Sequence, residues 1–255
     1  MNILLGINAV LLIVLIISCS KESIQSFIAK HKQAKKLHST DENRNKVFST
    51  NKGENIFILS ENNNKVSFEY FKNKDSIKSI HFYNPNTEID TATFTGCESL
   101  TDIKLPQNLK EIKPLTFAYC KNLQTIEIPK SVEKISTGAF LHCENLCSIE
   151  LNCGEIKTEA FSACSCLKII KFENHVKKIE KGAFKDCKNF HTIIIPNKHI
   201  RIAVDDNAFE GIREKSVKIE TIKKEEGDIT KNDIMKILNE KDLSRFPWLE
   251  IKEGK

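Results

Sequence analysis

The sequence predicts an α+β, mainly β repeat fold: a curved solenoid with an N-terminal β-hairpin cap and a short C-terminal helix. The first observation is a phenylalanine that recurs at steps of 23, 23, 21, 23 and 25 residues, at Phe94, Phe117, Phe140, Phe161, Phe184 and Phe209. The second is a cysteine three residues later in five copies, at Cys97, Cys120, Cys143, Cys164 and Cys187. A period of about 20–29 residues is typical of solenoids, in which each repeat forms one rung and packs on its neighbours.

Each repeat also carries a strand motif of the form Leu-x-x-Ile-x-Leu. It occupies residues 77–82, 100–105, 123–128, 146–151, 167–172 and 190–195, with Phe or Ile at some apolar positions. The last two apolar residues are two apart, so they point to the same face of a strand. The motif predicts about six leucine-rich repeats over residues 77–222.

The remainder of each repeat supplies a second side of the core. Leu109 and Ile112, or Val132 and Ile135, follow the strand at a three-residue spacing that suits a second short extended segment. The recurring phenylalanine then places one ring in each rung, and we expect these rings to stack into a spine.

One repeat interval is two residues short, because residues 152–155 replace a longer turn. Gly154 is expected to adopt a positive φ in this tighter path. A deletion at a turn that leaves the core positions intact predicts a tolerated change rather than a binding site.

The five cysteines at one repeat position raise the question of disulfides. Adjacent rungs lie about 4.8 Å apart, inside the usual range for a bridge, but the Cβ vectors of one column run nearly parallel rather than converging. Cysteine packs well as a small apolar side chain. We therefore expect buried free thiols, and the off-column Cys147, Cys153 and Cys166 fall in registers that suggest no obvious pair.

The first 18 residues predict a signal peptide. Residues 9–17 form an apolar run that ends in Ile16-Ile17-Ser18-Cys19. This ending resembles the lipobox of bacterial lipoproteins, which implies cleavage before Cys19 and acylation of that residue. Two or three acyl chains would anchor the protein stably, since each buried CH₂ contributes about 0.8 kcal/mol. The segment before the run lacks Lys and Arg, so an uncleaved anchor over residues 3–17 stays open as an alternative.

The segments that flank the repeats are expected to connect and cap them. Residues 19–53 contain the acylated Cys19 and a polar linker, and residues 54–76 form an N-terminal β cap, a hairpin of residues 55–59 and 66–71. Residues 223–255 form a C-terminal cap and tail. Thr230-Lys231-Asn232-Asp233 has the form of a capping box, and Ile234 and Ile237 follow at helical spacing.

The consensus Leu-x-x-Ile-x-Ile-Pro-x-x-Val-x-x-Ile-x-x-x-Ala-Phe-x-x-Cys-x-x-Leu resembles the BspA-like class of leucine-rich repeats, from residue 77 to about residue 219. The resemblance implies a bacterial surface or secreted protein, similar to adhesins that bind matrix proteins or other bacteria. It implies no catalytic residue, because the class has no catalytic motif to match.

No catalytic, metal-binding or cofactor-binding chemistry is predicted. The sequence lacks a P-loop, Gly-x-Ser-x-Gly, His-Glu-x-x-His and EF-hand motif. Cys143 and Cys164 face the predicted core, so they do not contribute to four convergent zinc ligands with their neighbours. A net charge of +5 without a basic stripe argues against nucleic acid as a partner.

The outward positions of the strands are the candidate binding surface. The residues proposed for contact with a ligand are Glu127, Glu150, Ile169, Lys171, Thr192 and Ile194. Ile169 and Ile194 are unusual because they are apolar at outward positions. Two interpretations stay open: the C-terminal helix or Trp248 covers them, or they form an exposed patch for a protein partner.

These features favour a membrane-tethered, extracytoplasmic binding or adhesion module. Its strand face would contact a protein or glycan, and the lipid anchor would hold it on a bacterial membrane, at the cell surface or in the periplasm. The alternative is an envelope scaffold lipoprotein without a host-binding role. An enzyme with a site on the caps is a third hypothesis, which a deep polar pocket with perturbed carboxylates would favour.

Overall fold

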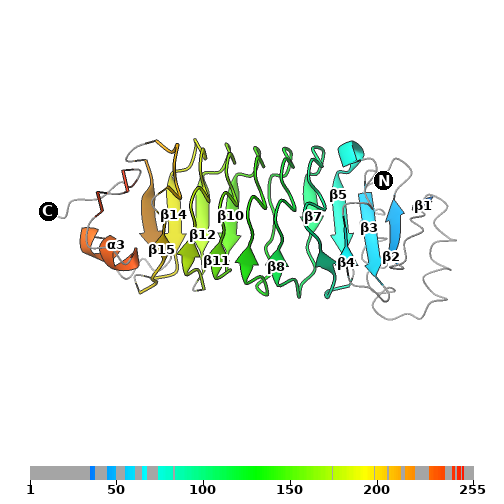
Figure 1. Cartoon of the computed structure of the whole chain (residues 1–255), viewed down its shortest axis with the longest axis horizontal. Helices are drawn as coiled ribbons and strands as arrows, with labels where there is room; N and C mark the ends of the chain where they lie inside the picture. Colours follow the sequence, from blue (N-terminus) through cyan, green and yellow to red (C-terminus); the bar gives the residue numbers. More distant parts are fainter. Residues whose placement is uncertain are drawn as a thin grey trace, which may run out of the picture.

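The computed structural model describes the repeats and parts of both flanking regions. The described residues are 35–37, 45–49, 55–60, 65–67, 74–82, 84–173, 175–197, 199–205, 207–213, 216–221, 230–238, 243–244, 246–247 and 249. The predicted signal peptide, Cys19 and Trp248 lie outside them. The rungs stack side by side along the long axis of the molecule (Figure 1).

The leucine-rich motifs form one long face of the stack, which we call the strand face. Its strands are β3 (Asn55–Ser60), β5 (Ser79–Phe82), β7 (Asp102–Lys104), β10 (Ser148–Leu151), β12 (Ile169–Phe172), β14 (Thr192–Ile195) and β16 (Lys218–Thr221). They pair in parallel with the isoleucines in register, as in Ile149 with Ile170 and Ile170 with Ile193. Residues 123–129 have no strand, although Leu123 and Ile126 keep their buried positions, so the face consists of two sheets.

The second apolar pairs form a narrower set of strands on the other side of the core. These strands are β4 (Lys65–Val66), β6 (Glu88–Ile89), β8 (Glu111–Ile112), β9 (Lys134–Ile135), β11 (Glu155–Ile156), β13 (Lys178–Ile179) and β15 (Ala203–Val204). Each pairs in parallel with a strand of an adjacent rung, and together they form two sheets, β4-β6 and β8-β9-β11-β13-β15. The predicted second extended segment is therefore confirmed.

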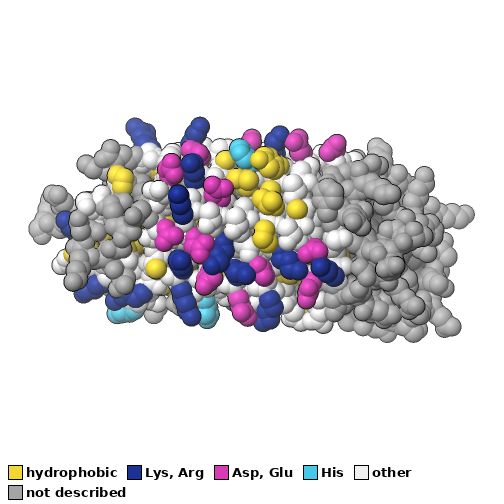
Figure 2. All heavy atoms as spheres, in the orientation of Figure 1, with side chains coloured by type: hydrophobic (Ala, Val, Ile, Leu, Met, Phe, Trp, Pro, Cys, Tyr) yellow, Lys and Arg dark blue, Asp and Glu magenta, His cyan; other side chains and the backbone are white. Residues whose placement is uncertain are grey.

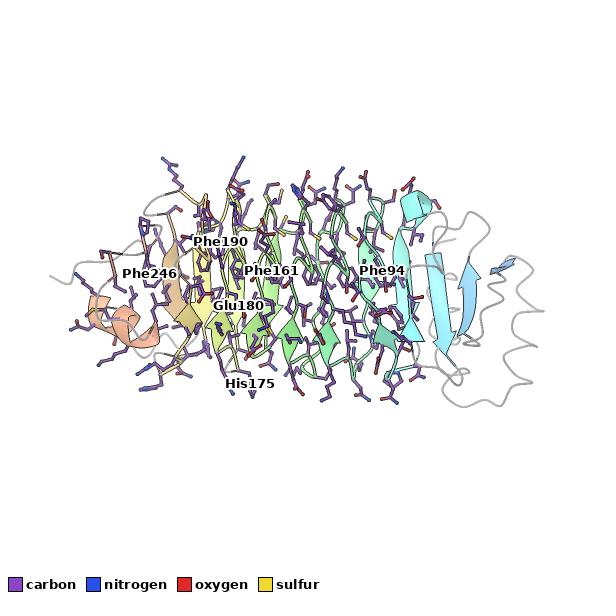
Figure 3. The ribbon with its side chains drawn as sticks, in the orientation of Figure 1. Phe94, Phe161, His175, Glu180, Phe190 and Phe246 are labelled. Carbon is purple, nitrogen blue, oxygen red and sulfur yellow. The ribbon has the colours of Figure 1, made fainter. Side chains whose placement is uncertain are left out.

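A column of phenylalanine rings fills the space between these two sides. Successive ring centroids from Phe94 to Phe209 are 5.4, 5.1, 5.0, 5.2 and 5.1 Å apart, with the ring planes nearly parallel. Phe94 and Phe161, labelled in Figure 3, lie along the middle of the stack and are fully buried. Stacked, buried rings contribute both apolar burial and ring–ring attraction, so the predicted spine is confirmed as the centre of the core.

The repeated cysteines lie beside the spine as free, buried thiols, as expected. The Sγ atoms of four of them donate to the backbone oxygen of the phenylalanine one rung earlier, at 3.1–3.2 Å. Burial raises the pKa of the Cys143 and Cys164 thiols well above the ordinary value of 9.0. These thiols therefore stay protonated and act as donors in the core.

The N-terminal cap differs from the expected hairpin. The antiparallel partner of β3 is β2 (Asn45–Ser49), which in turn pairs with β1 (Lys35–Leu37). β4 instead pairs in parallel with β6 on the other side of the core, so the described part of the second predicted strand, residues 66–67, does not pair with residues 55–59 as a hairpin. The prediction failed because the short-range turn signal was read alone, whereas β3 and β4 each align with a strand of the next repeat. A short 3₁₀ helix, η2 (Lys74–Ser76), then precedes β5.

The C-terminal end is capped by the helix α3 (Lys231–Ile237), as predicted. Thr230 Oγ1 accepts from the backbone N–H of Asp233, and an Asp233 carboxylate oxygen accepts from the backbone N–H of Thr230. Ile234 and Ile237 join the buried core at the end of the stack, where Phe246 also lies (Figure 3). β16 adds a final rung near the end of the predicted repeat region, residues 77–222.

Candidate binding surfaces

The strand face brings together most of the predicted contact residues. Ile169 pairs with Thr192, and Lys171 pairs with Ile194, in adjacent strands. Lys171 Nζ lies 2.8 Å from a carboxylate oxygen of Glu150 and 3.1 Å from one of Glu173. The hydrogen bond from Lys171 holds the pKa of Glu150 below its ordinary value, against the opposing effect of burial. These charges satisfy one another, which reduces what they offer to a ligand.

The two outward isoleucines are half-buried, and Trp248, which one interpretation invokes as their cover, lies outside the described residues. Ile194 lies beside Glu220 of β16 in the sheet, and α3 lies beyond the last rung rather than over β12 and β14 (Figure 1). Thr192 is only 9% exposed, and its Oγ1 lies 2.8 Å from His191 Nδ1. Glu127 is exposed on the rung whose leucine-rich motif, residues 123–128, forms no strand. Among these residues, Glu127 and Glu150 are the most accessible.

A second surface lies where each rung turns after the phenylalanine. We call it the aromatic edge and define it by Leu115, Tyr119, Leu141 and His142. The rings of Tyr119 and His142 stack at 5.0 Å with an angle of 11° between their planes. Leu115 is 39% exposed and Tyr119 is 41% exposed, and they are the exposed large hydrophobic residues of the described chain. Figure 2 shows hydrophobic side chains gathered beside a histidine on this side, above a band of charged side chains.

The backbone holds the aromatic edge in a fixed conformation. The N–H of Tyr119 donates to Leu141 O at 2.7 Å, and the N–H of His142 donates to Ser162 O at 2.9 Å. Leu115, Tyr119 and His142 all have φ between 56° and 62°, a region that non-glycine residues rarely occupy. Other rungs place Gly138 and Gly182 at the position of Leu115, and Gly96, Ala163 and Asp186 at the position of Tyr119.

Charged side chains surround the aromatic edge. Lys121 Nζ lies 2.8 Å from a carboxylate oxygen of Glu98, and Glu144 lies 3.6 Å from the Nδ1 atom of His142. This surface was not predicted, because its residues lie in the turns and not at the outward positions of the strands. The available signal was the pair of rings at one repeat position in successive rungs.

A third feature is a groove of about 590 Å³ beside the second set of strands. Lys130, Val132, Gly154, His175 and Lys177 are among its lining residues. Gly154 is not among the positive-φ residues, so the expectation of a positive φ there is wrong. A Cβ at this position would make only ordinary contacts, at 3.5 and 3.9 Å, with backbone oxygens of Glu133 and His175. The shortened turn needs no left-handed residue because the strand register continues through it.

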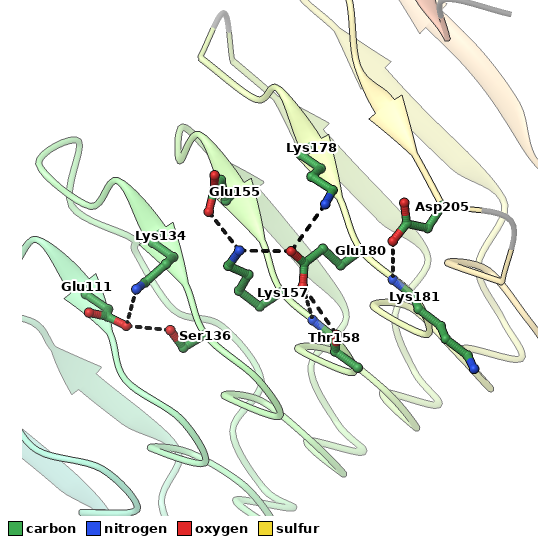
Figure 4. A network of polar contacts seen from close by, with 10 residues as sticks. All are labelled: Glu111, Lys134, Ser136, Glu155, Lys157, Thr158, Lys178, Glu180, Lys181 and Asp205. Atoms are coloured by element: carbon green, nitrogen blue, oxygen red, sulfur yellow. Dashed lines mark hydrogen bonds and ion pairs between the residues drawn. The ribbon is translucent and has the colours of Figure 1, made fainter.

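An ordered charge network crosses the second set of strands next to the groove (Figure 4). Glu180 lies 2.8 Å from Lys157 Nζ and also accepts from the N–H and hydroxyl of Thr158. Burial favours the neutral form of Glu180, but Lys157, Thr158 and Lys178 together outweigh it and lower its pKa. Lys157 also pairs with Glu155 at 2.9 Å. This network stabilises the stack and leaves no unmatched carboxylate at its centre.

Among the described residues, neither a candidate metal site nor a membrane-spanning helix is found. In this part of the chain, no three His, Cys, Asp or Glu side chains are grouped so that they could hold a metal ion. None of its helices is long and apolar enough to cross a membrane.

Comparison with known proteins identifies the repeats. The family model described as BspA type leucine rich repeat region matches residues 41–168 and 154–230, with 6 copies. The matched region starts before β3. This agrees with the structure, in which β3 pairs in parallel with β5 as an early rung of the stack. No curated protein matches the chain.

Several solved structures share the fold. A leucine-rich repeat protein from Bacteroides ovatus is 17% identical with a TM-score of 0.55, over 74% of this chain and 54% of that one. The pneumococcal vaccine antigen PcpA is 20% identical with a TM-score of 0.53, over 76% of this chain and 43% of that one. A leucine-rich repeat protein from Eubacterium ventriosum is 17% identical with a TM-score of 0.52, over 68% and 47%. The chain spans about half the length of these proteins, and at such identities the likeness concerns the fold.

Proposed function

This chain belongs to the BspA-type leucine-rich-repeat family, and from that premise we propose that it is a membrane-tethered, extracytoplasmic module that binds a protein partner. The solenoid supplies a rigid surface, and the residues before the repeats supply the tether. The lipobox-like ending at Cys19 supports lipid anchoring on a bacterial membrane. Binding requires no cofactor and no catalysis.

The observation that carries the proposal is the aromatic edge. It combines an exposed leucine, a stacked Tyr–His pair and flanking ion pairs on a backbone fixed by rung-to-rung hydrogen bonds. Protein interfaces have this composition, an apolar and aromatic centre with a charged rim, and tyrosine is enriched at their energetic hot spots. A fixed surface loses little conformational entropy when it binds.

Leu115 and Tyr119 are the expected anchors of this contact. Their side chains protrude from turns, and other rungs carry a small residue at the same positions, as Gly138 and Ala163 do. The strand-face residues Glu127, Glu150, Ile169, Lys171, Thr192 and Ile194 are proposed as a second, weaker contact. Their mutual ion pairs and partial burial limit the surface that they expose.

A matched pair of variants tests the proposal. Leu115→Gly with Tyr119→Ala introduces residues that other rungs of the stack already carry at these positions, so we expect the fold to be retained. Envelope and matrix proteins captured by the full-length wild type should be lost from this variant, whereas Glu127→Ala with Glu150→Ala, which truncates the weaker contact, should reduce their capture only slightly. Capture that survives in the first variant and fails in the second would move the contact to the strand face.

The alternative is an envelope scaffold without a host-binding role. Mass spectrometry of the native N-terminus tests acylation at Cys19, and protease treatment of intact cells tests which side of the envelope carries the repeats. An unmodified N-terminus would argue against the lipid anchor. Repeats protected from protease in intact cells would favour the periplasmic scaffold.

A further inference from the structure

The groove beside the second set of strands has a defined origin in the chain. The backbone of Gly154 lies between the segments that contain Glu133 and Lys177, in the two adjacent rungs. The N–H of Gly154 donates to Glu133 O at 2.8 Å, and its carbonyl accepts from the N–H of Lys177 at 2.9 Å. The rung of Gly154 is the one with the shortened turn. Its neighbours keep longer turns, so a gap one rung wide opens between Lys130 on one side and His175 on the other.

The charges in the groove leave an excess of positive side chains. Glu133 pairs with Lys110 at 3.3 Å, Glu111 pairs with Lys134 at 2.9 Å, and Glu155 pairs with Lys157 at 2.9 Å. Lys130 and Lys177 also line the groove, and both are exposed. Within the described chain neither forms an ion pair, and Lys130 acts on Glu150 only through longer-range attraction. Two ammonium groups therefore face the gap without a matching carboxylate beside them.

Two further polar side chains of the groove, Asn152 and His175, suit a hydroxyl-rich ligand. His175 Nδ1 lies 2.7 Å from Asn152 Oδ1, which orients both side chains at the outer margin of the rung. His175 lies at this margin in Figure 3. Val132 is the one aliphatic side chain among the lining residues, and it is buried. A polar ligand thus finds hydrogen-bond partners here.

We propose that this groove binds a short segment of an acidic polysaccharide, with a sugar carboxylate between Lys130 and Lys177. A volume of about 590 Å³ lies in the range of small-ligand sites and exceeds what a single phosphate or carboxylate ion would fill. A peptide strand is disfavoured because the backbone N–H and C=O of Gly154 are already bonded to the adjacent rungs. The site is separate from the aromatic edge, so this inference does not depend on the proposed protein partner.

Binding of defined oligosaccharides to the full-length protein tests the inference. A galacturonic acid hexasaccharide should bind by calorimetry, and its affinity should fall as salt is added, since the lysine contacts are exposed. An uncharged glucose hexasaccharide and a hexaglutamate peptide serve as comparison ligands and should bind much more weakly. Equal or tighter binding of the peptide would overturn the assignment to a glycan.

Charge reversal locates the site. Lys130→Glu with Lys177→Glu should weaken binding of the acidic hexasaccharide about tenfold or more, because each change replaces an attraction with a repulsion. Lys104→Glu with Lys168→Glu makes the same change in net charge on the strand face, at exposed lysines without ion pairs in the described chain, and should leave affinity within about twofold. Equal losses in both variants would show a nonspecific charge effect and overturn the inference.

A second variant separates the shape of the groove from its charge. Gly154→Gln adds a neutral side chain to the groove at a position where a Cβ makes only ordinary contacts, so the fold should be retained. We expect a loss of hexasaccharide binding with an unchanged melting temperature. Unchanged binding with a filled groove would place the ligand elsewhere and refute the proposal.

Discussion

The Sγ atom of Cys143 lies 3.1 Å from the backbone oxygen of Phe117, one rung closer to the N-terminus. Cys120, Cys164 and Cys187 make the same contact with Phe94, Phe140 and Phe161. The cysteine column therefore connects each rung to the preceding one through an S–H donor, and it does so without a covalent bond. Cysteine suits the position better than alanine because its side chain fills the core and gives a second donor to a buried carbonyl, since Phe117 O also accepts from the backbone N–H of Cys120.

The contact of Cys143 predicts a measurable contribution to stability. Cys143→Ala removes the donor and leaves a small cavity, so the free energy of unfolding should fall by about 1–3 kcal/mol. Urea unfolding followed by circular dichroism measures the change. Cys147→Ala, at an exposed thiol, should stay within about 0.5 kcal/mol of the wild type. Equal losses would mean that burial and the carbonyl contact carry no weight.

Thiol chemistry should distinguish the column from the surface. Iodoacetamide at pH 8 should modify the exposed Cys147 and spare the five column cysteines until denaturant is added, as read by peptide mass spectrometry. Burial raises the pKa of Cys187 from 9.0 to about 12. Its contribution to stability is thus fully present below pH 9 and is lost between pH 9 and 12, where the unfolded thiol ionises first. Rapid modification of Cys143 in the folded chain would contradict this account.

The Glu180 network predicts sensitivity to acid. The pKa of Glu180 is lowered from 4.5, so its stabilising contribution is present above pH 4.5 and is lost as pH falls through the folded-state pKa. Glu180→Gln should lower the free energy of unfolding by about 1–2 kcal/mol at pH 7 and reduce the acid-dependent loss. Unfolding midpoints at pH 7 and pH 3 give both quantities.

An exposed pair provides the control for Glu180. Glu133 pairs with Lys110 at 3.3 Å, but the two side chains are 76% and 71% exposed. Glu133→Gln should change stability by less than about 0.5 kcal/mol, because solvent screens the pair. A larger effect for Glu133 than for Glu180 would invert the expected order.

The phenylalanine spine should be the most sensitive part of the core. Phe140 is fully buried between Phe117 and Phe161, so Phe140→Ala should cost about 3–5 kcal/mol and lower the urea midpoint. Tyr119→Ala, at a ring that is 41% exposed, should cost about 1 kcal/mol or less. Similar costs at the two positions would show that the rungs relax around the missing ring.

The core could be predicted from the spacing of its residues, because each rung packs the same residue types against the same neighbours. Phe140 and Cys143 recur at fixed positions, and a residue that recurs in register meets its own equivalents in the neighbouring rungs. The pairing of β3 and β4 could not be predicted from the turn between them. β3 pairs with β5 and β4 pairs with β6, and both partners lie in the next repeat.

The candidate binding surfaces could not be predicted, because they consist of contacts between residues that are far apart in the sequence and lie on adjacent rungs. Tyr119 and His142 are 23 residues apart and stack only because the backbone ladder sets them on adjacent rungs. The groove at Gly154 likewise depends on the space between the two neighbouring turns. The shortened turn, which we predicted to be a tolerated change, therefore contributes residues to the lining of the groove.

By itself, the sequence determined the repeat, its register, the buried identity of the phenylalanine and cysteine columns, and the capping box of the last helix. Each of these follows from local periodicity or from contacts between equivalent positions. Only the tertiary structure decided which outward residues stay exposed, which charges pair, and where the stack is open. Those properties depend on how the side chains and turn lengths of one rung differ from those of the next. Such differences change exposure and charge pairing only because the rungs pack side by side.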